Sequence, residues 1–210
     1  MRLKPIMLVG LTSTIIAIGS TSASAQMSQA EMQAMMAGWS ASSQKAFMAT
    51  MAKYGPPQEM TRTEAMWLNN GPWKYTMISA TAIPHSFPVP HDDVMKQAVN
   101  YNVPPSMFDD LATYDGSVIV ERTKGEIAAR CDQEGANMLA LNLANDIITH
   151  RRNIADARAY YARAINTFHQ TGTMDPYMQQ LMFTPPATSG DPDHPAGMSA
   201  GGTPRPERGF

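Results

Sequence analysis

The best metal-ligand candidates in the sequence are two histidines that enclose a proline-rich stretch. His85 and His91 flank Ser-Phe-Pro-Val-Pro, and the carboxylates of Asp92 and Asp93 follow directly. A histidine pair with nearby carboxylates suits zinc or copper. A spacing of six residues across prolines is not one that a family of metal sites requires, and such loops more often form stiff surface connections. The sequence therefore leaves two alternatives, a metal site at His85, His91 and Asp92 or a surface loop.

Two carboxylates and an arginine on a predicted β-hairpin are the best candidates for catalysis. Glu121, Glu126 and Arg130 lie on one side of that hairpin, with Lys124 at its tip. Neighbouring carboxylates can differ in pKa and divide the acid and base roles of a reaction. Asp146, on the following helix, could join them in an enzyme. The alternative is a solvated sheet face, on which cross-strand ion pairs contribute a few tenths of a kcal/mol each.

A polar stripe interrupts the apolar helix that follows the hairpin. Its members recur at i, i+3, i+4 and i+7, and they are Asn142, Asn145, Asp146 and Thr149. If the stripe faces solvent, it is only the wet side of the helix. If it is buried, each group needs a partner, and we expect Arg122 or Arg130 of the hairpin to supply one. A buried stripe would either form the floor of a ligand pocket, with Arg122, Asn142 and Asn145 in contact, or lock the helix to the sheet.

The only cysteine, Cys131, stands just before the same helix. A helix N-terminus can lower a thiol pKa and make the sulfur reactive. The hairpin pattern places Cys131 on the apolar face, however, and the adjacent Asp132 opposes formation of a thiolate. We therefore expect a buried structural thiol, with a redox or nucleophilic thiol and an intermolecular disulfide as the alternatives.

Methionine is unusually common. Of 18 methionines, all but Met1 and Met7 lie beyond residue 25, and four of them cluster in residues 27–36. Thioethers bind Cu(I), so copper handling through methionine and histidine is one interpretation. Packing or a soft partner-binding surface is the other.

The elements that must position these groups are best defined in the second half of the chain. Residues 117–122 and 126–131 read as two strands, and if Lys124-Gly125 is the loop, Ile119 faces Arg130. Val118, Val120, Ile127, Ala129 and Cys131 then share the apolar side. A helix at 133–149, capped by Asp132, and a helix at 153–171, capped by Asn153 with Asp156 as its capping-box partner, should cover the hairpin.

Patterning elsewhere predicts one more strand and several shorter helices. Residues 73–78 read as a strand, whereas 59–68 are ambiguous and the prolines of 84–90 oppose regular structure. Helices are expected at 26–40, from Ser42 or Ser43 to 54, at 91–101 and at about 105–115. The predicted fold is α+β, a small antiparallel sheet whose hairpin (117–131) packs against helices 133–149 and 153–171.

The first 25 residues have the layout of a secretory signal peptide. Arg2 and Lys4 precede an apolar run from Ile6 to Ile18, and Ala23-Ser24-Ala25 offers a cleavage site. The run is shorter than the roughly 20 residues that a bilayer core needs, so no membrane span is expected after cleavage. We predict four regions: a signal peptide (1–25), a Met-rich segment (26–40), a single domain (41–183) and a disordered Pro/Gly-rich tail (184–210).

Charge excludes one class of partner. The whole chain carries 16 basic and 18 acidic side chains, and removal of Arg2 and Lys4 with the signal leaves 14 basic ones. A mildly acidic domain without a basic cluster is a poor ligand for nucleic acid, because neutralisation of phosphates dominates such binding.

Several linear motifs carry a resemblance to a known group of proteins. They are Asn69-Asn-Gly-Pro-Trp-Lys74, Pro84-His-x-Phe-Pro-x-Pro-His91, Asp115-Gly-Ser-Val-Ile-Val-Glu-Arg-Thr-Lys-Gly-Glu126, Ala129-Arg-Cys-Asp132 and Leu139-Ala-Leu-Asn-Leu-Ala-Asn-Asp146. With them, residues 53–183 resemble a family of uncharacterised secreted bacterial proteins. The resemblance implies export and a single domain, and it brings no activity, cofactor or catalytic residue.

Together these observations favour an exported, periplasmic or secreted protein that binds an unknown protein or small molecule without catalysing a reaction. The alternatives are an enzyme that uses the hairpin and the following helix, and a copper or zinc protein that uses methionine and histidine. No cofactor is predicted from the sequence.

Overall fold

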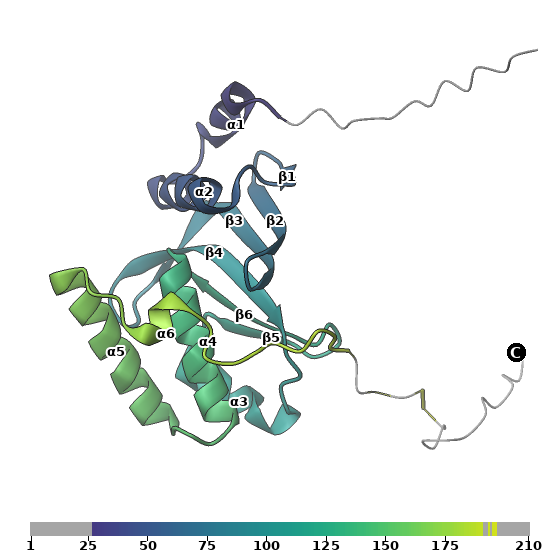
Figure 1. Cartoon of the computed structure of the whole chain (residues 1–210), viewed down its shortest axis with the longest axis vertical. Helices are drawn as coiled ribbons and strands as arrows, with labels where there is room; N and C mark the ends of the chain where they lie inside the picture. Colours follow the sequence, from purple (N-terminus) through teal and green to yellow (C-terminus); the bar gives the residue numbers. More distant parts are fainter. Residues whose placement is uncertain (1–26, 191–192, 194, 197–210) are drawn as a thin grey trace, which may run out of the picture.

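A computed structural model describes residues 27–190, 193 and 195–196 of the 210-residue chain, so the predicted signal peptide lies outside the described residues. One antiparallel sheet, of strand order β1-β2-β3-β4-β6-β5, runs through the described part (Figure 1). Its strands are β1 (Glu59–Met60), β2 (Glu64–Asn70), β3 (Trp73–His85), β4 (His91–Asn100), β5 (Val118–Glu121) and β6 (Glu126–Cys131). The α+β fold is confirmed, with three more strands than the sequence predicted.

The helices fall into two groups along the sheet. The N-terminal helices α1 (Gln29–Met36) and α2 (Ala41–Tyr54) lie beside the β1–β3 end (Figure 1). The later helices lie at the β4–β5 end, and they are the short 3₁₀ turn η1 (Pro105–Met107) with α3 (Phe108–Tyr114), α4 (Glu134–Ile148), α5 (Ile154–Thr171) and α6 (Pro176–Gln179). α4 packs on β6, β4 and β5, and α5 packs on α4 and α3.

The hairpin faces agree with the sequence prediction, but its register does not. Residues on the predicted apolar side, Val118, Val120, Ile127, Ala129 and Cys131, all join the core beneath α4. The strands pair Val118 with Ala129 and Glu121 with Glu126, two residues away from the predicted register. A four-residue turn replaces the two-residue loop, and Gly125 at φ 61° ends it. The shift by an even number leaves every side chain on its predicted face.

The predicted helix at 91–101 is wrong, because this segment is β4. The strand lies between β3 and β6 and is buried along most of its length. A strand buried on both faces has no alternation of apolar and polar residues. Asp92 and Asp93 therefore resembled the acidic first turn of a helix, and only the pairing with β3 and β6 identifies a strand.

The two long helices begin and end close to the predicted positions. Asn153 caps α5 and accepts a hydrogen bond from the Asp156 amide at 2.8 Å, and Gly172 ends the helix with φ 71°. The predicted cap of α4 is wrong: its N-cap residue is Gln133, with no side-chain cap bond, and Asp132 accepts from the Cys131 thiol instead. The cap of α2 is Ser40 rather than Ser42 or Ser43.

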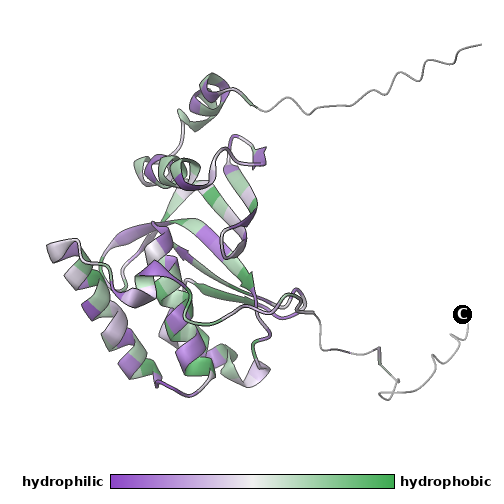
Figure 2. Cartoon of the chain, viewed as in Figure 1, coloured by the Kyte–Doolittle hydropathy of each residue, from purple (hydrophilic) through white to green (hydrophobic). Residues whose placement is uncertain are grey.

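Two groups of buried side chains form the core, and Figure 2 shows hydrophobic residues along the central strands and α4. The larger group lies among β4–β6 and α3–α5. The smaller group contains Met32, Met36, Phe47, Trp67 and Ile78. Met32 and Met36 of α1 thus pack in the core, which supports the packing interpretation over copper binding for these two residues.

Glu134 connects the two groups at the start of α4. Its carboxylate accepts hydrogen bonds from Lys53 (2.6 Å) and Tyr54 (2.5 Å) at the end of α2. It also accepts from the Trp73 indole at 2.7 Å. These bonds join the last turn of α2, the first residue of β3 and the first turn of α4.

The first part of the predicted disordered tail lies on the folded body. The Asn100 side-chain amide donates to the carbonyl oxygens of Pro186 (3.3 Å) and Ala187 (3.1 Å). Ser189 lies so close to Gly125 that a Cβ built there would be 2.7 Å from the serine Cβ. Residues 186–189 thus contact the folded body, whereas 191–192, 194 and 197–210 lie outside the described residues.

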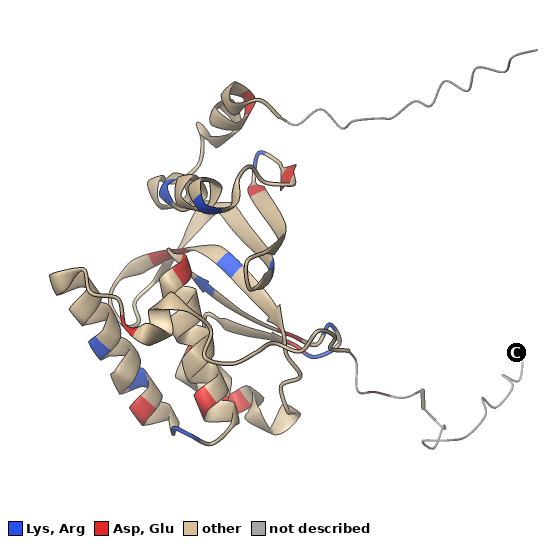
Figure 3. Ribbon diagram, viewed as in Figure 1, with Lys and Arg blue, Asp and Glu red and all other residues tan. Residues whose placement is uncertain are grey.

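Within the described residues, no helix combines the length and the apolar character that a membrane crossing demands. Acidic and basic side chains are interspersed over the body (Figure 3).

Candidate metal-binding site

The candidate site lies where β3 ends and β4 begins. The loop 86–90 turns the chain back so that His85 and His91 are direct partners across the two strands. Their imidazole rings are 4.9 Å apart between centroids. The strand pairing thus brings together two histidines that the sequence separates by six residues.

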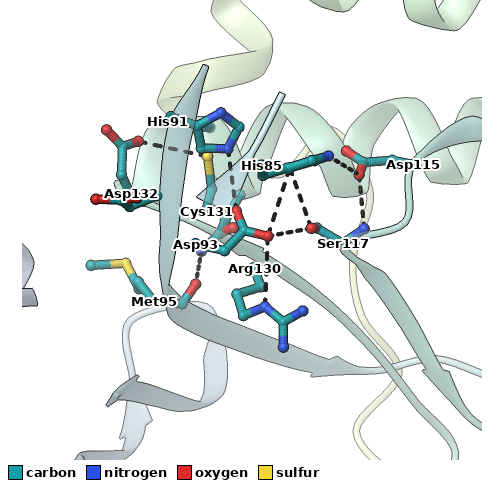
Figure 4. A network of polar contacts seen from close by, with 12 residues as sticks. His85, His91, Asp93, Met95, Asp115, Ser117, Arg130, Cys131 and Asp132 are labelled. Carbon is teal, nitrogen blue, oxygen red and sulfur yellow. Dashed lines mark hydrogen bonds and ion pairs between the residues drawn. The ribbon is translucent and has the colours of Figure 1, made fainter. Parts of the chain in front are cut away.

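The carboxylate of the site belongs to Asp93, not to Asp92. Side chains alternate along a strand, so Asp93 lies on the same side of β4 as His91, and Asp92 on the other. Asp92 accepts a hydrogen bond from Ser42 at 2.5 Å. One ligand atom each from His85, His91 and Asp93 fits within 4.8 Å, and their side chains point toward one another (Figure 4).

Asp93 is 1 % exposed, and its two oxygens have different surroundings. Oδ2 accepts a short hydrogen bond from the Ser117 hydroxyl and lies 3.6 Å from the Arg130 Nε. Oδ1 has no hydrogen-bond partner among the described residues and faces His91 Nε2 at 3.2 Å. Within the described part of the chain, the second oxygen is therefore paired with His91 alone.

The contacts of His91 define which of its ring nitrogens faces Asp93. Nδ1 lies 2.8 Å from the carbonyl oxygen of Val89, and because a carbonyl only accepts, Nδ1 carries a proton and donates. Nε2 then either has a lone pair facing the Asp93 carboxylate or carries a second proton. In the described part of the chain, Nε2 is also buried without a hydrogen-bond partner. A positive charge, either a proton or a metal ion, must lie between these two atoms.

Electrostatics favour a cation at this position. The Asp93 carboxylate, with a smaller contribution from Cys131, raises the pKa of His91 to about 11. Burial alone would raise the pKa of Asp93, but the neighbouring His91 and the hydrogen bond from Ser117 outweigh burial and lower it. At neutral pH a proton on His91 therefore supplies the positive charge beside Asp93, and a zinc ion would have to replace that proton.

His85 is the third residue of the cluster, and both of its ring nitrogens lie near oxygen atoms. Its Nδ1 lies 3.6 Å from Asp93 Oδ2 and 3.4 Å from the Ser117 hydroxyl oxygen. Its Nε2 lies 3.7 Å from Asp115 Oδ1. The His85 side chain is 21 % exposed, more than those of His91 (12 %) and Asp93 (1 %), so solvent reaches the cluster at His85.

The donor set fits zinc in chemistry and in spacing. Zinc binds imidazole nitrogen and carboxylate oxygen at about 2.0–2.2 Å, and two ligand atoms in a tetrahedral site lie about 3.4 Å apart. The 3.2 Å separation of His91 Nε2 from Asp93 Oδ1 is close to that spacing. Small movements of His85 would complete a three-ligand site with room for a water or another ligand.

Cys131 lies beside this cluster but does not have the character of a reactive thiol. The side chain is 5 % exposed, and burial raises the pKa of the thiol above its ordinary value. Its Sγ donates to Asp132 Oδ1 at 3.6 Å. These contacts support the structural interpretation of this cysteine.

The residues of the enzyme hypothesis do not form one group. Glu121 and Glu126 are direct partners on the hairpin, but lysines neutralise them: Lys96 (3.2 Å) and Lys124 (2.5 Å) at Glu121, and Lys74 (2.6 Å) at Glu126. Arg130 instead extends toward Asp93. Both carboxylates therefore have ion-pair partners, but Glu126 is 4 % exposed and does not lie on the solvated sheet face that the alternative assumed.

Asn142, Asn145 and Asp146 of the polar stripe are buried and lock helices and loops together, whereas Thr149, just after α4, is exposed. Asn142 donates to the carbonyls of Tyr177 (2.9 Å) and Gln180 (2.8 Å), and it accepts from the Met182 amide at 2.6 Å. Asn145 accepts from Tyr101 at 2.7 Å. The Asn142 bonds hold α6 and the segment after it on α4, and the Asn145 bond holds Tyr101, just after β4, on the same helix.

Asp146 has partners other than the expected Arg122 and Arg130. It accepts from Arg151 Nε (2.8 Å), Arg152 Nε (2.9 Å) and the Tyr177 hydroxyl (3.0 Å). Arg122 pairs with Asp193. The expectation of a hairpin arginine is wrong because the turn after α4 supplies two closer ones.

Sequence reasoning named Asp93 beside Asp92 but chose Asp92 as the ligand, and it missed Asp115 and Ser117 as members of the site. The residues of the site lie on different elements, and the pairings among β3, β4, β6 and β5 bring them together. The only available signal was the alternation of His91 and Asp93, which points to one side of a strand and has no meaning in the helix that was predicted there.

Comparisons with known proteins provide no family or fold relationship for this chain. No protein-family model matches it, and no curated protein or solved structure shows significant similarity.

Proposed function

We propose that this chain is an exported, non-enzymatic binding protein whose ligand is a zinc ion, held by His85, His91 and Asp93. The observation that carries the proposal is the convergence of His85, His91 and Asp93, which offer one ligand atom each within 4.8 Å, with His91 Nε2 and Asp93 Oδ1 facing each other at 3.2 Å. Burial of a charged carboxylate is costly unless a positive group compensates it. A zinc ion would satisfy both atoms.

Zinc is favoured over Cu(I) by the donor atoms. Cu(I) prefers sulfur, whereas imidazole and carboxylate suit zinc. The sulfur of Cys131, beside the cluster, is engaged with Asp132, and the α1 methionines Met32 and Met36 pack in the core. Three protein ligands with access from solvent are typical of sites that exchange a fourth ligand.

The test is metal binding by protein without a histidine tag, stripped with a chelator. After equilibration with zinc and removal of the excess, we expect one zinc per chain by elemental analysis. Each of the variants His85→Gln, His91→Gln and Asp93→Asn should lose at least about tenfold in zinc affinity, because each removes one of the three ligands. His150→Gln, a change at an exposed histidine in the turn after α4, is the matched control and should bind as the wild type does.

Two results would contradict the proposal. One is wild-type protein that retains no stoichiometric zinc. The other is His85→Gln and His91→Gln protein that is folded by circular dichroism and retains zinc as tightly as the wild type.

Export is the second part of the proposal, and it is supported by the sequence of residues 1–25. The positive start, the apolar run and Ala23-Ser24-Ala25 predict cleavage before Gln26. Mass spectrometry of native protein should find Gln26 at the N-terminus. Native protein that retains residues 1–25 in the cytoplasm would contradict export and leave the metal site untouched.

A further inference from the structure

The tight turn Asp115-Gly116-Ser117 joins α3 to β5 and contacts the candidate zinc site from outside. The Ser117 amide donates to Asp115 Oδ1 at 2.8 Å, and the Val118 amide donates to the Asp115 carbonyl at 3.1 Å. Both Asp115 (3 % exposed) and Ser117 (6 % exposed) are buried. A buried carboxylate with one backbone donor is incompletely compensated, so a positive group beside it, such as a protonated or metal-bound His85, would stabilise it.

We propose that Asp115 and Ser117 are positioning residues of the zinc site. Asp115 would hold the Nε2 side of His85, so that Nδ1 faces the ion. Ser117 would occupy one oxygen of Asp93, so that the other oxygen is the ligand. This inference rests on the proposed zinc-binding function. It extends the site to a turn that contributes no ligand atom itself.

Asp115 acts on the tautomer of His85. A histidine that ligates a metal with one nitrogen almost always donates its other N–H to a carboxylate, a carbonyl or water, and that contact fixes the ring. Asp115 Oδ1 is 3.7 Å from His85 Nε2, on the side of the ring away from Asp93. Binding of an ion at Nδ1 would place the proton on Nε2, and a small movement of the ring would complete the bond to Asp115.

Ser117 distinguishes the two oxygens of Asp93. The Ser117 hydroxyl has one proton, and it donates this proton to Oδ2. Arg130 approaches the same oxygen at 3.6 Å. Donors thus surround Oδ2, whereas Oδ1 accepts from no described residue. An ion would therefore bind Asp93 through Oδ1 alone.

The Ser117 hydroxyl also restricts His85. Because its proton goes to Asp93, its oxygen faces His85 Nδ1 at 3.4 Å as an acceptor. With the proton of His85 on Nε2, the lone pairs of His85 Nδ1 and Ser117 Oγ would face each other at 3.4 Å, and a cation beside them would relieve their repulsion. The turn therefore shapes a position for a cation from the side opposite to His91 (Figure 4).

The first test uses wild-type protein, so that no variant needs to fold. Nitrogen-15 NMR of the histidine rings in the zinc-loaded protein distinguishes a proton on Nδ1 from one on Nε2. We expect His85 to carry its proton on Nε2 and His91 to carry its proton on Nδ1. A His85 ring protonated on Nδ1 in the zinc-loaded protein would overturn the role of Asp115.

The second test measures zinc affinity by competition with a chromophoric chelator. Loss of an outer partner of a metal ligand typically weakens binding about 10- to 100-fold, so we expect losses in this range for Asp115→Asn and Ser117→Ala. The side-chain oxygen that remains in Asp115→Asn can still accept from the Ser117 amide, so the turn should persist. Asp109→Asn and Ser106→Ala, both at positions of the neighbouring segment outside the site, are matched controls and should bind as the wild type does.

The visible spectrum of the cobalt-substituted protein separates positioning from simple destabilisation. Asp115→Asn should change the d–d bands, because His85 is held differently, while the circular dichroism of the metal-free protein remains that of the wild type. If wild-type protein binds no zinc, the proposed function and this inference both fall. If it binds zinc through His85, His91 and Asp93 and Asp115→Asn and Ser117→Ala leave affinity and spectrum unchanged, only this inference falls.

Discussion

Asp146 is the clearest place to test how α4, α5 and α6 are held together. Its side chain is 4 % exposed and accepts hydrogen bonds from Arg151, Arg152 and Tyr177. Asp146→Asn keeps the shape of the side chain and removes its charge. One carboxylate oxygen becomes an amino group, which faces a donor and can no longer accept.

The expected loss follows from how exposed each partner is. A hydrogen bond to a charged group contributes about 1.5–3 kcal/mol to stability when it is shielded from water. Arg151 is 55 % exposed, and at such exposure an ion pair contributes about 0–1 kcal/mol. Arg152 is 29 % exposed and its guanidinium lies 4.4 Å from the Tyr160 ring centre, so its bond should be the stronger one. We expect Asp146→Asn to lower the free energy of unfolding by about 3 kcal/mol.

Urea unfolding of the metal-free protein at pH 7 measures this loss. The control is Asp109→Asn, at a site without buried contacts, which should change the free energy of unfolding by no more than about 0.5 kcal/mol. A double-mutant cycle with Arg152→Gln should give a coupling energy of about 1–2 kcal/mol, because removal of either partner disrupts the same bond. A loss below about 1 kcal/mol for Asp146→Asn, or additive effects in the cycle, would refute this account of the contact.

Three further changes have defined outcomes. Leu141→Ala, at a fully buried position of α4, should lower the free energy of unfolding in urea by about 2–5 kcal/mol, because the surrounding side chains cannot fill the cavity that it leaves. A smaller loss would mean that the core relaxes around the cavity. Gly125→Ala should lower the free energy of unfolding by about 1 kcal/mol or more, because φ of this residue is 61° and the new Cβ would clash with Ser189. Displacement of Ser189 should then let limited proteolysis cut near residue 189 sooner than in the wild type. The Lys124 ammonium, together with Lys96, holds the pKa of Glu121 below its ordinary value, so its charge stabilises the fold above about pH 4.5 and this contribution disappears as the pH falls through the lowered value. Wild type and Glu121→Gln should therefore differ by less than about 1 kcal/mol at pH 7 and converge near pH 2, and a difference that grows at low pH would contradict this.

The parts of the fold that local sequence determines were the parts predicted from it. Asn153, Asp156 and Gly172 are capping signals that act within a few residues, and α5 begins and ends where they indicate. The apolar face of the hairpin was likewise predictable, because a period of two survives an even shift of register. The turn length was not, because Gly125 tolerates several turns and contacts with residues 189–190 belong to a distant part of the chain.

The candidate site depends on pairings that no local pattern encodes. β4 was mistaken for a helix because a strand between two others needs no polar face. With that error, Asp92 looked equivalent to Asp93, although the strand points them to opposite sides. Asp115 and Ser117 join the site only because β5 pairs with β6, and β6 pairs with β4.

The length of β3 and β4 has a consequence for how the protein unfolds. Each strand contributes to both hydrophobic groups: Trp73 and Val99 belong to the larger group, and Ile78 and Met95 to the smaller. The same two strands therefore run through both groups, and Glu134 fastens α2 to α4 across them. The N-terminal third of the described chain cannot unfold by itself without breaking the pairing of β3 with β4. Thermal unfolding should therefore proceed as one cooperative transition. A fragment that starts at residue 59 would leave Trp67 and Ile78 bare to water and should fail to fold, rather than survive as a smaller domain.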